Sequence, residues 1–312
     1  MSEQTLPTTL RLARSPARLR SGKGGLTLLD RYFGFAAVTP TVLVSLLVFG
    51  LPLGFSFWIS FQGWSIQQSI FGGRFVGLQN YTDLFDDPTF VASIGRTFIY
   101  TGSTVAAEMA FGLLIALLLN CDLPFIGIFR TALIVPMMMT PIVAALCWKM
   151  LLDPRFGVID YLIGSPIVWL GHPVLAFISV AGVNVWQNAP YVAILLLAGL
   201  RSLPTEPVEA ASIDGASRWQ TFRHVTLPLL RPYLVVALLL RVIFEFRSFD
   251  NVYVMTSGGP ADSTLLLSIY TYVTSFVSFD MSLAAASSWV MLAIALVFCL
   301  AFVAIVRRRD AN

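Results

Sequence analysis

Long apolar segments alternate with shorter polar ones along the whole chain. Six of the apolar segments are near or above the length needed to cross about 30 Å of hydrocarbon, which predicts six transmembrane helices. Their approximate bounds are residues 32–59, 94–119, 132–152, 174–200, 233–255 and 283–306. Pro40 and Pro52 lie inside the first segment and predict kinks there, which membrane helices tolerate. The pattern is typical of an all-α membrane protein.

Two further segments predict short helices that lie on the membrane surface. In the exposed loop after the first span, Tyr81, Leu84 and Phe85 have the spacing of one helical face. Residues 263–279 are apolar, but Thr, Ser and Tyr interrupt them. We therefore expect an interfacial helix on the outer side in that segment and not a seventh crossing.

The polar ends of the chain set its orientation. Residues 1–30 are basic and rich in Ser, Pro and Gly, which predicts a disordered tail, and residues 307–312 begin with three arginines. Six spans place both ends on one side of the membrane. If that side is the cytoplasm, fourteen of the twenty Lys and Arg residues face it, as the positive-inside rule requires. We predict cytoplasmic N- and C-termini flanking a transmembrane domain of residues 31–306.

A charged segment, residues 203–231, separates the fourth and fifth spans. Prolines and glutamates at its start favour a helix N-terminus, and Gly215 is suited to end that helix in a left-handed turn. Ser217 and Gln220 have the spacing of a capping box for a second helix, which we expect Pro228 to close. The 203–231 loop is therefore predicted to be two short helices outside the membrane.

Composition agrees with a membrane protein and limits the chemistry. The mean hydropathy is +0.79 and only 12% of the residues are charged, well outside the soluble globular range. The three cysteines have no paired spacing, so neither a disulfide framework nor a metal site is predicted. No phosphate-binding loop and no hydrolase or metalloprotease motif is present, so no catalytic residues are predicted. The basic tail is explained better by membrane orientation than by nucleic-acid binding.

Polar side chains inside the spans are the candidates for a solute pathway, because a charge at the bilayer centre usually faces a cavity or a partner. In the fifth span, Arg241, Glu245 and Ser248 share a helix face. One interpretation is that these three residues line a solute pathway. The alternative is that Arg241 and Glu245 only neutralise each other. In the fourth span a polar stripe has i, i+3, i+4, i+7 spacing, formed by Asn184, Gln187, Asn188 and Tyr191.

The 203–231 loop resembles the E-A-A loop of binding-protein-dependent ABC importer permeases. The residues that carry the likeness are Glu209, Ala210, Ala211, Asp214, Gly215, Ala216, Phe222, Leu227, Pro228 and Pro232. Gly77 to Tyr81 and Thr256 to Pro260 resemble loops of the carbohydrate permeases in that group, of the maltose, trehalose and glycerol-phosphate type. The resemblance implies a multi-pass inner-membrane subunit in which this loop is a cytoplasmic coupling helix.

The resemblance also implies partners and roles. The partners would be two ATPase subunits that hold ATP and Mg²⁺, a second and different permease, and an extracytoplasmic solute-binding protein, with no cofactor on this chain. The docking residues would be Glu209, Ala210, Ala211, Asp214, Gly215, Arg218, Phe222 and Pro228. A solvated charged face is the alternative for that loop.

The family's sugar-contacting positions fall on the polar residues of spans four and five, although Gln187 and Asn188 are not the residues found there. On span three they include Met137 and Pro141, for which plain packing is the alternative. Glu108 in span two would make either an interhelical hydrogen bond or part of the pathway. A sugar or sugar derivative is the expected solute. Arg241 and Arg247 leave open an anionic one, such as a glycerol phosphate or a sulfo-sugar, and a membrane-embedded enzyme is a remote alternative.

Overall fold

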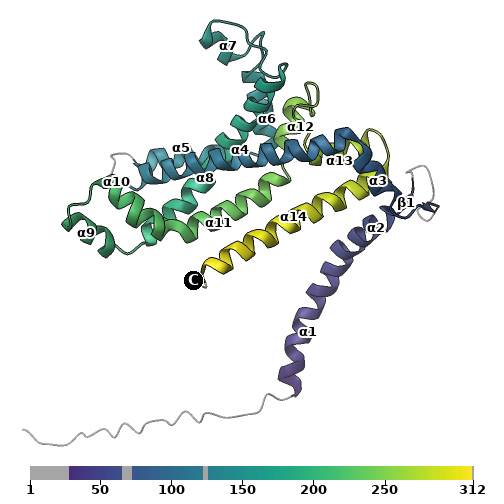
Figure 1. Ribbon diagram of the computed structural model, residues 1–312, viewed down its shortest axis with the longest axis horizontal. Helices are drawn as coiled ribbons and strands as arrows, with labels where there is room; N and C mark the ends of the chain where they lie inside the picture. The colour runs from purple at the N-terminus through teal and green to yellow at the C-terminus, as the bar shows by residue number, and fades with distance from the viewer. Residues whose placement is uncertain (1–27, 65–71, 122–125, 311–312) are drawn as a thin grey trace, which may run out of the picture. The chain divides into compact units, whose positions relative to one another are not determined.

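The computed structural model describes residues 28–64, 72–121 and 126–310, and within these ranges the chain is almost entirely helical (Figure 1). The elements before the second span are α1 (Leu28–Ser45), η1 (a π-helical turn, Leu46–Gly50), α2 (Leu51–Ile59), β1 (Gln62–Gly63), β2 (Arg74–Phe75) and α3 (Gln79–Asp86). Those that follow are α4 (Pro88–Leu119), α5 (Ile126–Met138), α6 (Pro141–Leu151), α7 (Val158–Ile163), α8 (Pro173–Ser202), α9 (Glu206–Ile213), α10 (Arg218–Thr221), η2 (a π-helical turn, Phe222–Thr226), α11 (Leu227–Phe246), α12 (Asp250–Thr256), α13 (Leu267–Phe276) and α14 (Met281–Asp310). The predicted disordered tail lies almost wholly outside the described residues.

Five of the described helices are long and apolar enough to cross a membrane. They are Ala37–Ile59, Pro88–Leu119, Pro173–Ser202, Arg218–Phe246 and Met281–Leu300. A bent pair, α5 with α6, makes a sixth candidate if the pair is one span. The prediction of a helical membrane protein is therefore confirmed, and the six predicted spans correspond to five candidate helices, or to six if the bent pair is one span.

The chain divides into two compact units, residues 1–54 and 55–312. In the first unit α1 runs through Pro40 without a break, and the π-helical turn η1 comes immediately before Pro52. Proline has no N–H to donate to the carbonyl four residues earlier, and a wider turn is a common way for a helix to accommodate such a defect. Local sequence therefore accounts for the irregularity in this helix.

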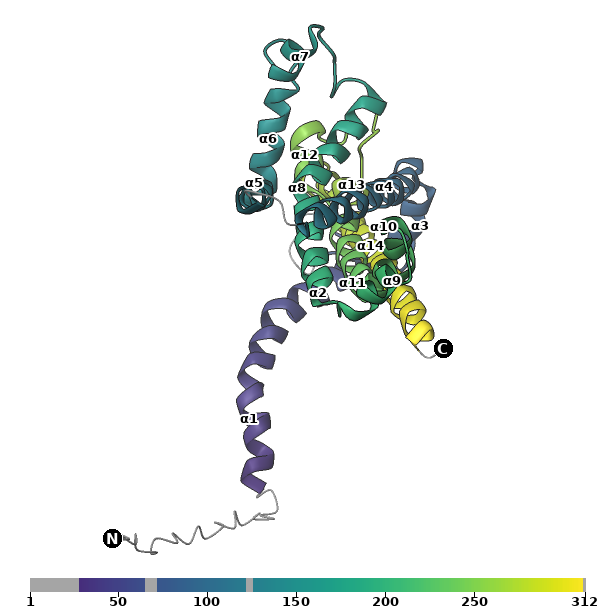
Figure 2. The same cartoon turned by 90° about the vertical axis from the view of Figure 1, so that its left-hand side faces the viewer.

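In the second unit, α4, α8, α11 and α14 form a helical bundle (Figures 1 and 2). α4 and α8 pack closely because Gly112 has no side chain: a Cβ atom there would lie 2.5 Å from Cγ1 of Val192. Gly199 of α8 permits a similar approach by the ring of Tyr233 on α11. Small residues at such crossings are what membrane helix packing favours.

The third predicted span, residues 132–152, is not a continuous helix. α5 and α6 meet at a bend of 99°, and Thr140 between them has an extended backbone. The residue before a proline is sterically disfavoured in the helical region, and Pro141 follows Thr140 directly. The predicted third span is therefore present as a bent pair of helices and not as one helix.

The fifth predicted span, residues 233–255, also differs. The helix begins earlier, at Arg218, and continues through the π-helical turn η2 and Pro228 to Phe246. Pro228 lies in the first turn of α11, where a missing N–H is tolerated, so it does not close the second helix of the 203–231 loop as expected. After Phe246 the chain breaks before α12 begins at Asp250.

The local structure predicted for the 203–231 loop is confirmed in its first half. α9 is a short helix, and Gly215 after it has a φ of +79°, but α10 is the first turn of the helix that continues into α11 and not a separate short helix. Ser217 and Gln220 form the capping box: the Gln220 backbone N–H donates to the Ser217 Oγ at 3.3 Å, and the Ser217 backbone N–H donates to the Gln220 Oε1 at 2.7 Å. α9 and α10 lie at the end of the bundle opposite α3 (Figure 1).

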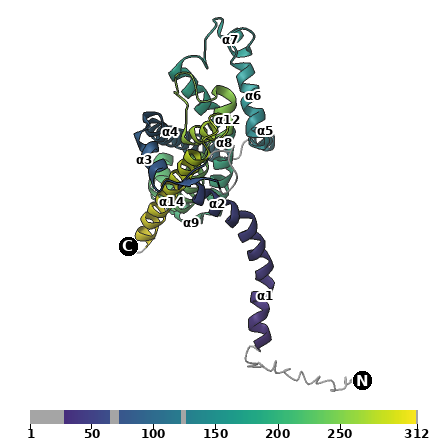
Figure 3. The same cartoon turned by 90° about the vertical axis from the view of Figure 1, so that its right-hand side faces the viewer.

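Both segments predicted to form membrane-surface helices are helical, as α3 and α13, and their position on the membrane surface stays a prediction. Leu84 of α3 is fully buried, and Phe85 next to it is exposed. α13 packs against α14, and α3 lies beside α4 (Figure 3). Tyr270 of α13 donates a 2.8 Å hydrogen bond to Asp87, which caps the start of α4 by accepting from the backbone N–H of Thr89. Because burial of Asp87 is outweighed by these hydrogen bonds, its pKa is lowered.

Candidate functional site

A buried ion cluster ties α4 to α11 in the middle of the bundle. Arg241 donates from Nε to Glu108 Oε2 at 2.7 Å and from Nη2 to Glu108 Oε1 at 2.9 Å. It also pairs with Glu245, one turn further along α11. All three side chains are at least nine-tenths buried. A guanidinium that presents a planar fork of donors is suited to hold two carboxylates in this way.

Amide side chains of α8 extend this cluster. Asn188 accepts from Arg241 Nη1 at 3.2 Å and donates from Nδ2 to Asn184 Oδ1 at 2.5 Å. Asn184 in turn donates to Glu245 and, at 2.9 Å, to the hydroxyl of Tyr100 on α4. Three helices are therefore joined by one continuous hydrogen-bond network, which we call the ion–amide network.

Gln187 connects the same region of α8 to the two helix breaks. Its Nε2 donates to the carbonyl of Met139 at 2.9 Å, at the bend between α5 and α6. Its Oε1 accepts from Asn251 of α12 at 3.0 Å. A backbone carbonyl freed by a broken membrane helix needs such a partner, because no water is available in hydrocarbon. The side chain that the sequence suggested for the pathway thus also holds the breaks in place.

A polar pocket of about 530 Å³ lies where these elements meet. Its lining comes from the α5–α6 bend, from α8, and from the end of α11 with the start of α12. The residues are Met137, Met139, Pro141, Asn184, Gln187, Asn188, Arg241, Phe244, Glu245, Arg247, Ser248, Phe249, Asp250 and Asn251. Amides, a hydroxyl and both signs of charge therefore face one space, which suits a solute that both donates and accepts hydrogen bonds.

Most of the predicted pathway residues come together here, but two do not line the pocket. Tyr191 packs instead against the apolar core formed by Val192, Leu196 and their neighbours. Glu108 sits behind Arg241 as its bidentate partner. Met137, which the resemblance suggested, does line the pocket.

Sequence reasoning did not include Phe244, Phe249 and Asn251 in this site. Phe244 lines the pocket with more than half of its surface exposed, and Phe249 and Asn251 follow the break after α11. Phe244 lies directly before Glu245 in an apolar run, and the sequence alone does not distinguish it from a core residue. The two others depend on a helix break that the apolar pattern did not reveal.

The two arginines of the pocket differ in how many hydrogen-bond and ion-pair partners they already have within the protein. Arg241 donates to two carboxylates and an amide, so few of its N–H groups are left to bind a solute. Arg247 is exposed, and no described carboxylate lies within ion-pair distance of it. A negatively charged solute group would therefore meet Arg247 more readily than Arg241.

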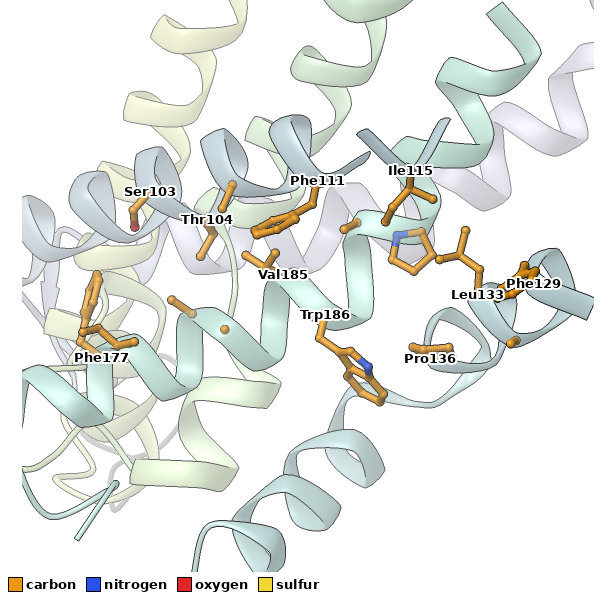
Figure 4. A pocket seen from close by; sticks show the side chains of 17 residues that line it. Ser103, Thr104, Phe111, Ile115, Phe129, Leu133, Pro136, Phe177, Val185 and Trp186 are labelled. Atoms are coloured by element: carbon orange, nitrogen blue, oxygen red, sulfur yellow. The ribbon is translucent and has the colours of Figure 1, made fainter. Parts of the chain in front are cut away.

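A second, larger pocket of about 800 Å³ lies between α4, α5 and α8 and is apolar (Figure 4). Side chains such as Phe111, Leu133 and Val185 form its walls, and the few polar groups include Ser103 and Thr104. Its surface offers almost no hydrogen-bonding groups to a polar solute. This pocket is therefore not the solute site.

The residues singled out in the 203–231 loop are mostly exposed and lie close together on α9, α10 and η2. Those that are exposed are Glu209, Ala210, Asp214, Gly215, Arg218 and Pro228, and those that are partly buried are Ala211 and Phe222. Two large apolar side chains that the sequence argument passed over are exposed on the same loop: Ile213 at 86% and Trp219 at 66%. Exposed apolar groups within a charged surface indicate a place where another protein binds.

The bundle, its polar pocket and the exposed helical loop define a multi-pass membrane transport subunit. Residues 90–311 match the family described as binding-protein-dependent transport system inner membrane component, and the chain belongs to that family. It is therefore an inner-membrane permease of an ABC-type transporter.

Similar proteins of known sequence share this assignment. The chain is 41% identical to a probable ABC transporter permease protein of Sinorhizobium fredii, over 80% of this chain and 82% of that one. It is 36% identical to a trehalose/maltose transport system permease protein of Thermococcus litoralis (77% and 82% covered). It is 30% identical to a sulfoquinovosyl glycerol transport system permease protein of Agrobacterium fabrum (91% and 94% covered).

A solved structure has the same fold. A chain of a bacterial ABC transporter involved in the import of the acidic polysaccharide alginate superimposes with a TM-score of 0.78. The match covers 90% of this chain and 97% of that one, at 22% sequence identity. At this identity the likeness concerns the fold alone.

Proposed function

We propose that this permease translocates a sugar or sugar derivative that an extracytoplasmic solute-binding protein delivers, within an importer driven by ATP. The observation that carries the proposal is the polar pocket, where amides of α8 face Ser248 and Glu245 at the end of α11. Carboxamides and hydroxyls both donate and accept, as the hydroxyls of a sugar do. The names of the relatives, with trehalose, maltose and sulfoquinovosyl glycerol as solutes, support the same solute class.

The energy for transport comes, in this proposal, from separate ATPase subunits that bind ATP and Mg²⁺. The 203–231 loop is their docking site and lies on the cytoplasmic side together with both chain ends, as the distribution of Lys and Arg favours. Exposed Ile213 and Trp219 would enter a groove on the ATPase, with Glu209 and Arg218 at its rim. Closure of the ATPases would then move the loop and rock the spans between inward and outward openings.

A second permease completes the pathway. The polar pocket is only partly enclosed by this chain, and a different permease subunit would complete the enclosure of the solute. We expect two ATPases, two unlike permeases, the solute-binding protein and the surrounding lipid as the partners of this chain.

Reconstitution tests the sugar proposal directly. The importer, assembled with its ATPases, second permease and binding protein in proteoliposomes, should take up labelled trehalose or maltose only when ATP is present. Ser248→Ala should lower that uptake severalfold, because it removes a hydroxyl of the pocket. Ser288→Ala on α14, away from the pocket, is the matched control and should have little effect. ATP-dependent uptake of a non-sugar solute, with none of either sugar, would refute the proposal.

An anionic sugar is the second candidate, and one observation favours it. Arg247 lines the pocket without a carboxylate partner among the described residues, and one relative is named for a sulfonated solute. If the natural solute is anionic, Arg247→Gln should reduce its uptake at least tenfold while the uptake of a neutral disaccharide changes little. Equal losses for neutral and anionic solutes would remove this candidate.

A further inference from the structure

Four aromatic rings on α12 and α13 form a connected series beside the polar pocket. The rings of Phe249 and Tyr253 are stacked, with centroids 5.1 Å apart and planes inclined by 13°. Tyr253 contacts Tyr272 at 4.8 Å, and Tyr272 contacts Phe276 at 5.2 Å. Tyr272 also lies 5.1 Å from Phe249. We call these four residues the aromatic series.

The two ends of the aromatic series differ in their surroundings. Phe249 lines the polar pocket itself, directly after Ser248. Phe276, at the end of α13, is 59% exposed. α12 and α13 lie together at the side of the bundle away from α9 and α10 (Figure 1). The series therefore runs from an exposed side chain at the end of α13, on the side away from the 203–231 loop, to the lining of the polar pocket.

Core packing accounts for only part of these rings: Phe249 and Tyr253 pack against the buried core, with part of each side chain left accessible. The two helices bury other side chains in the core, including Val252, Met255, Leu267 and Ile269, each at most 2% exposed. None of the four rings is classed as buried: three are partly exposed and Phe276 is exposed. Each of the four rings therefore keeps part of its surface outside that core.

The backbone around the series is fixed by polar contacts. Ser268 of α13 donates to the carbonyl of Ser248 at 2.5 Å, which ties α13 to the break after α11. The hydroxyls of Thr256 and Thr264 share a 2.7 Å hydrogen bond across the α12–α13 connection. Lys149 of α6 donates to the carbonyl of Val254 on α12 at 2.9 Å. The rings are therefore held in position before any solute arrives.

We propose that Phe249, Tyr253, Tyr272 and Phe276 bind pyranose rings in succession and guide a sugar from the outer surface to the polar pocket. The C–H face of a pyranose carries partial positive charge, and the face of an aromatic ring is negative, so the two stack. Tyrosine hydroxyls at the ring edges donate to and accept from the hydroxyls of the sugar. The inference rests on the proposed sugar transport and adds a binding site outside the pocket.

Photocrosslinking in the reconstituted importer tests the contact with solute. The photoreactive residue p-benzoylphenylalanine is introduced in place of Phe276 or, as the matched control, of Phe279, which is equally exposed and outside the series. With binding protein loaded with tritiated trehalose or maltose, we expect label on the Phe276 variant at least about fivefold above the Phe279 variant. Equal labelling, or crosslinking of position 276 to the second permease in place of the sugar, would overturn the proposal.

Substitutions test whether the ring is needed for transport. Tyr272→Leu keeps an apolar side chain but removes the ring, and we expect uptake to fall about threefold to tenfold. Tyr272→Phe keeps the ring and should retain most of the uptake. If the Leu variant transports as well as the Phe variant, the aromatic series is not a sugar site. Uptake by the unmodified importer separates the hypotheses: its absence for every sugar would refute sugar transport itself.

Discussion

At the scale of single residues, Arg241 forms ion pairs with two carboxylates at once. Glu108 and Glu245 both lie against the guanidinium, and all three groups are withdrawn from solvent. The favourable interactions of a buried ion pair roughly balance the cost of desolvation while the pair is complete. Removing one member destabilises the protein, because the remaining charges stay buried without a partner and their desolvation is no longer balanced.

We predict that Arg241→Met destabilises the permease by about 3–5 kcal/mol, since it leaves two adjacent carboxylates unpaired. Thermal unfolding of the detergent-solubilised protein measures the loss. Arg218→Met, on the exposed surface of α10, is the control and should change stability by no more than about 0.5 kcal/mol. A loss for Arg241→Met no larger than the control would contradict the buried cluster.

Asp87 predicts a pH dependence. Its pKa is lowered in the folded protein, because hydrogen bonds from Tyr270 and the backbone of Thr89 outweigh the effect of burial. The resulting stabilisation is complete above the pKa of the unfolded carboxyl, about 3.9, and is lost as the pH falls through the lower folded value. Melting temperatures measured from pH 6 downward should fall less steeply below pH 4 in Asp87→Asn than in the unmodified protein. Identical slopes would show that the contact contributes nothing.

At the scale of elements, contact between α4 and α8 sets the position of the pocket. α4 contributes Glu108 and Tyr100, and α8 contributes the two asparagines that join them. Gly112, four residues beyond Glu108, allows close contact between α4 and α8, because a Cβ atom at this position would overlap the side chain of Val192. Any displacement of the helices at that crossing is transmitted to the ion–amide network one turn away.

Gly112→Ala should therefore destabilise the protein by about 1–3 kcal/mol, because the new methyl group overlaps Val192 and the backbone of Ala193. Gly102→Ala on the same helix is a matched control: nothing lies within 4 Å of its Cβ position, and the change should be neutral or stabilising by up to about 1 kcal/mol. Thermal unfolding of both variants gives the comparison. Equal effects would mean that α4 and α8 are not in close contact at Gly112.

The same elements show what the sequence could and could not predict. The lengths of the apolar segments predicted the long helices, and the capping residues predicted local structure in the 203–231 loop, because both signals are local in the sequence. Pro141 was visible in the sequence, but a 99° bend also needs a partner for the freed carbonyl, and Gln187 comes from another helix. In the same way the i,i+4 spacing suggested the pairing of Arg241 with Glu245, whereas Glu108 lies 133 residues away in the chain.

At the scale of the whole molecule, α9 and α10 lie at one end of the bundle and continue directly into α11, which carries Arg241 and Glu245. A force applied to the loop would therefore act on the pocket through a single helix, which includes the π-helical turn η2. Gly215, with its φ of +79°, sets the angle between α9 and α10.

Gly215→Pro should abolish both uptake and the stimulation of ATP hydrolysis, because proline is confined to a φ near −65° and cannot form this turn. Membrane insertion and total expression should be unchanged, since Gly215 is exposed at the loop. Gly215→Asn is the control: asparagine tolerates the left-handed region, and the variant should keep most of the activity. Normal stimulation of the ATPase by the proline variant would show that the loop does not transmit the movement.

One feature of α4 makes lipid composition a variable for this protein. Its 32 residues extend for about 48 Å at a rise of about 1.5 Å per residue, whereas the hydrocarbon layer is about 30 Å thick. The helix must tilt from the bilayer normal or project beyond the hydrocarbon layer, and a thinner bilayer increases the tilt or the projection that is needed. Tyr100 and Glu108 lie near its midpoint and hydrogen-bond to Asn184 and Arg241, which line the polar pocket. A change in membrane thickness would therefore act on the pocket through the ion–amide network, so acyl-chain length should be held constant whenever transport rates are compared.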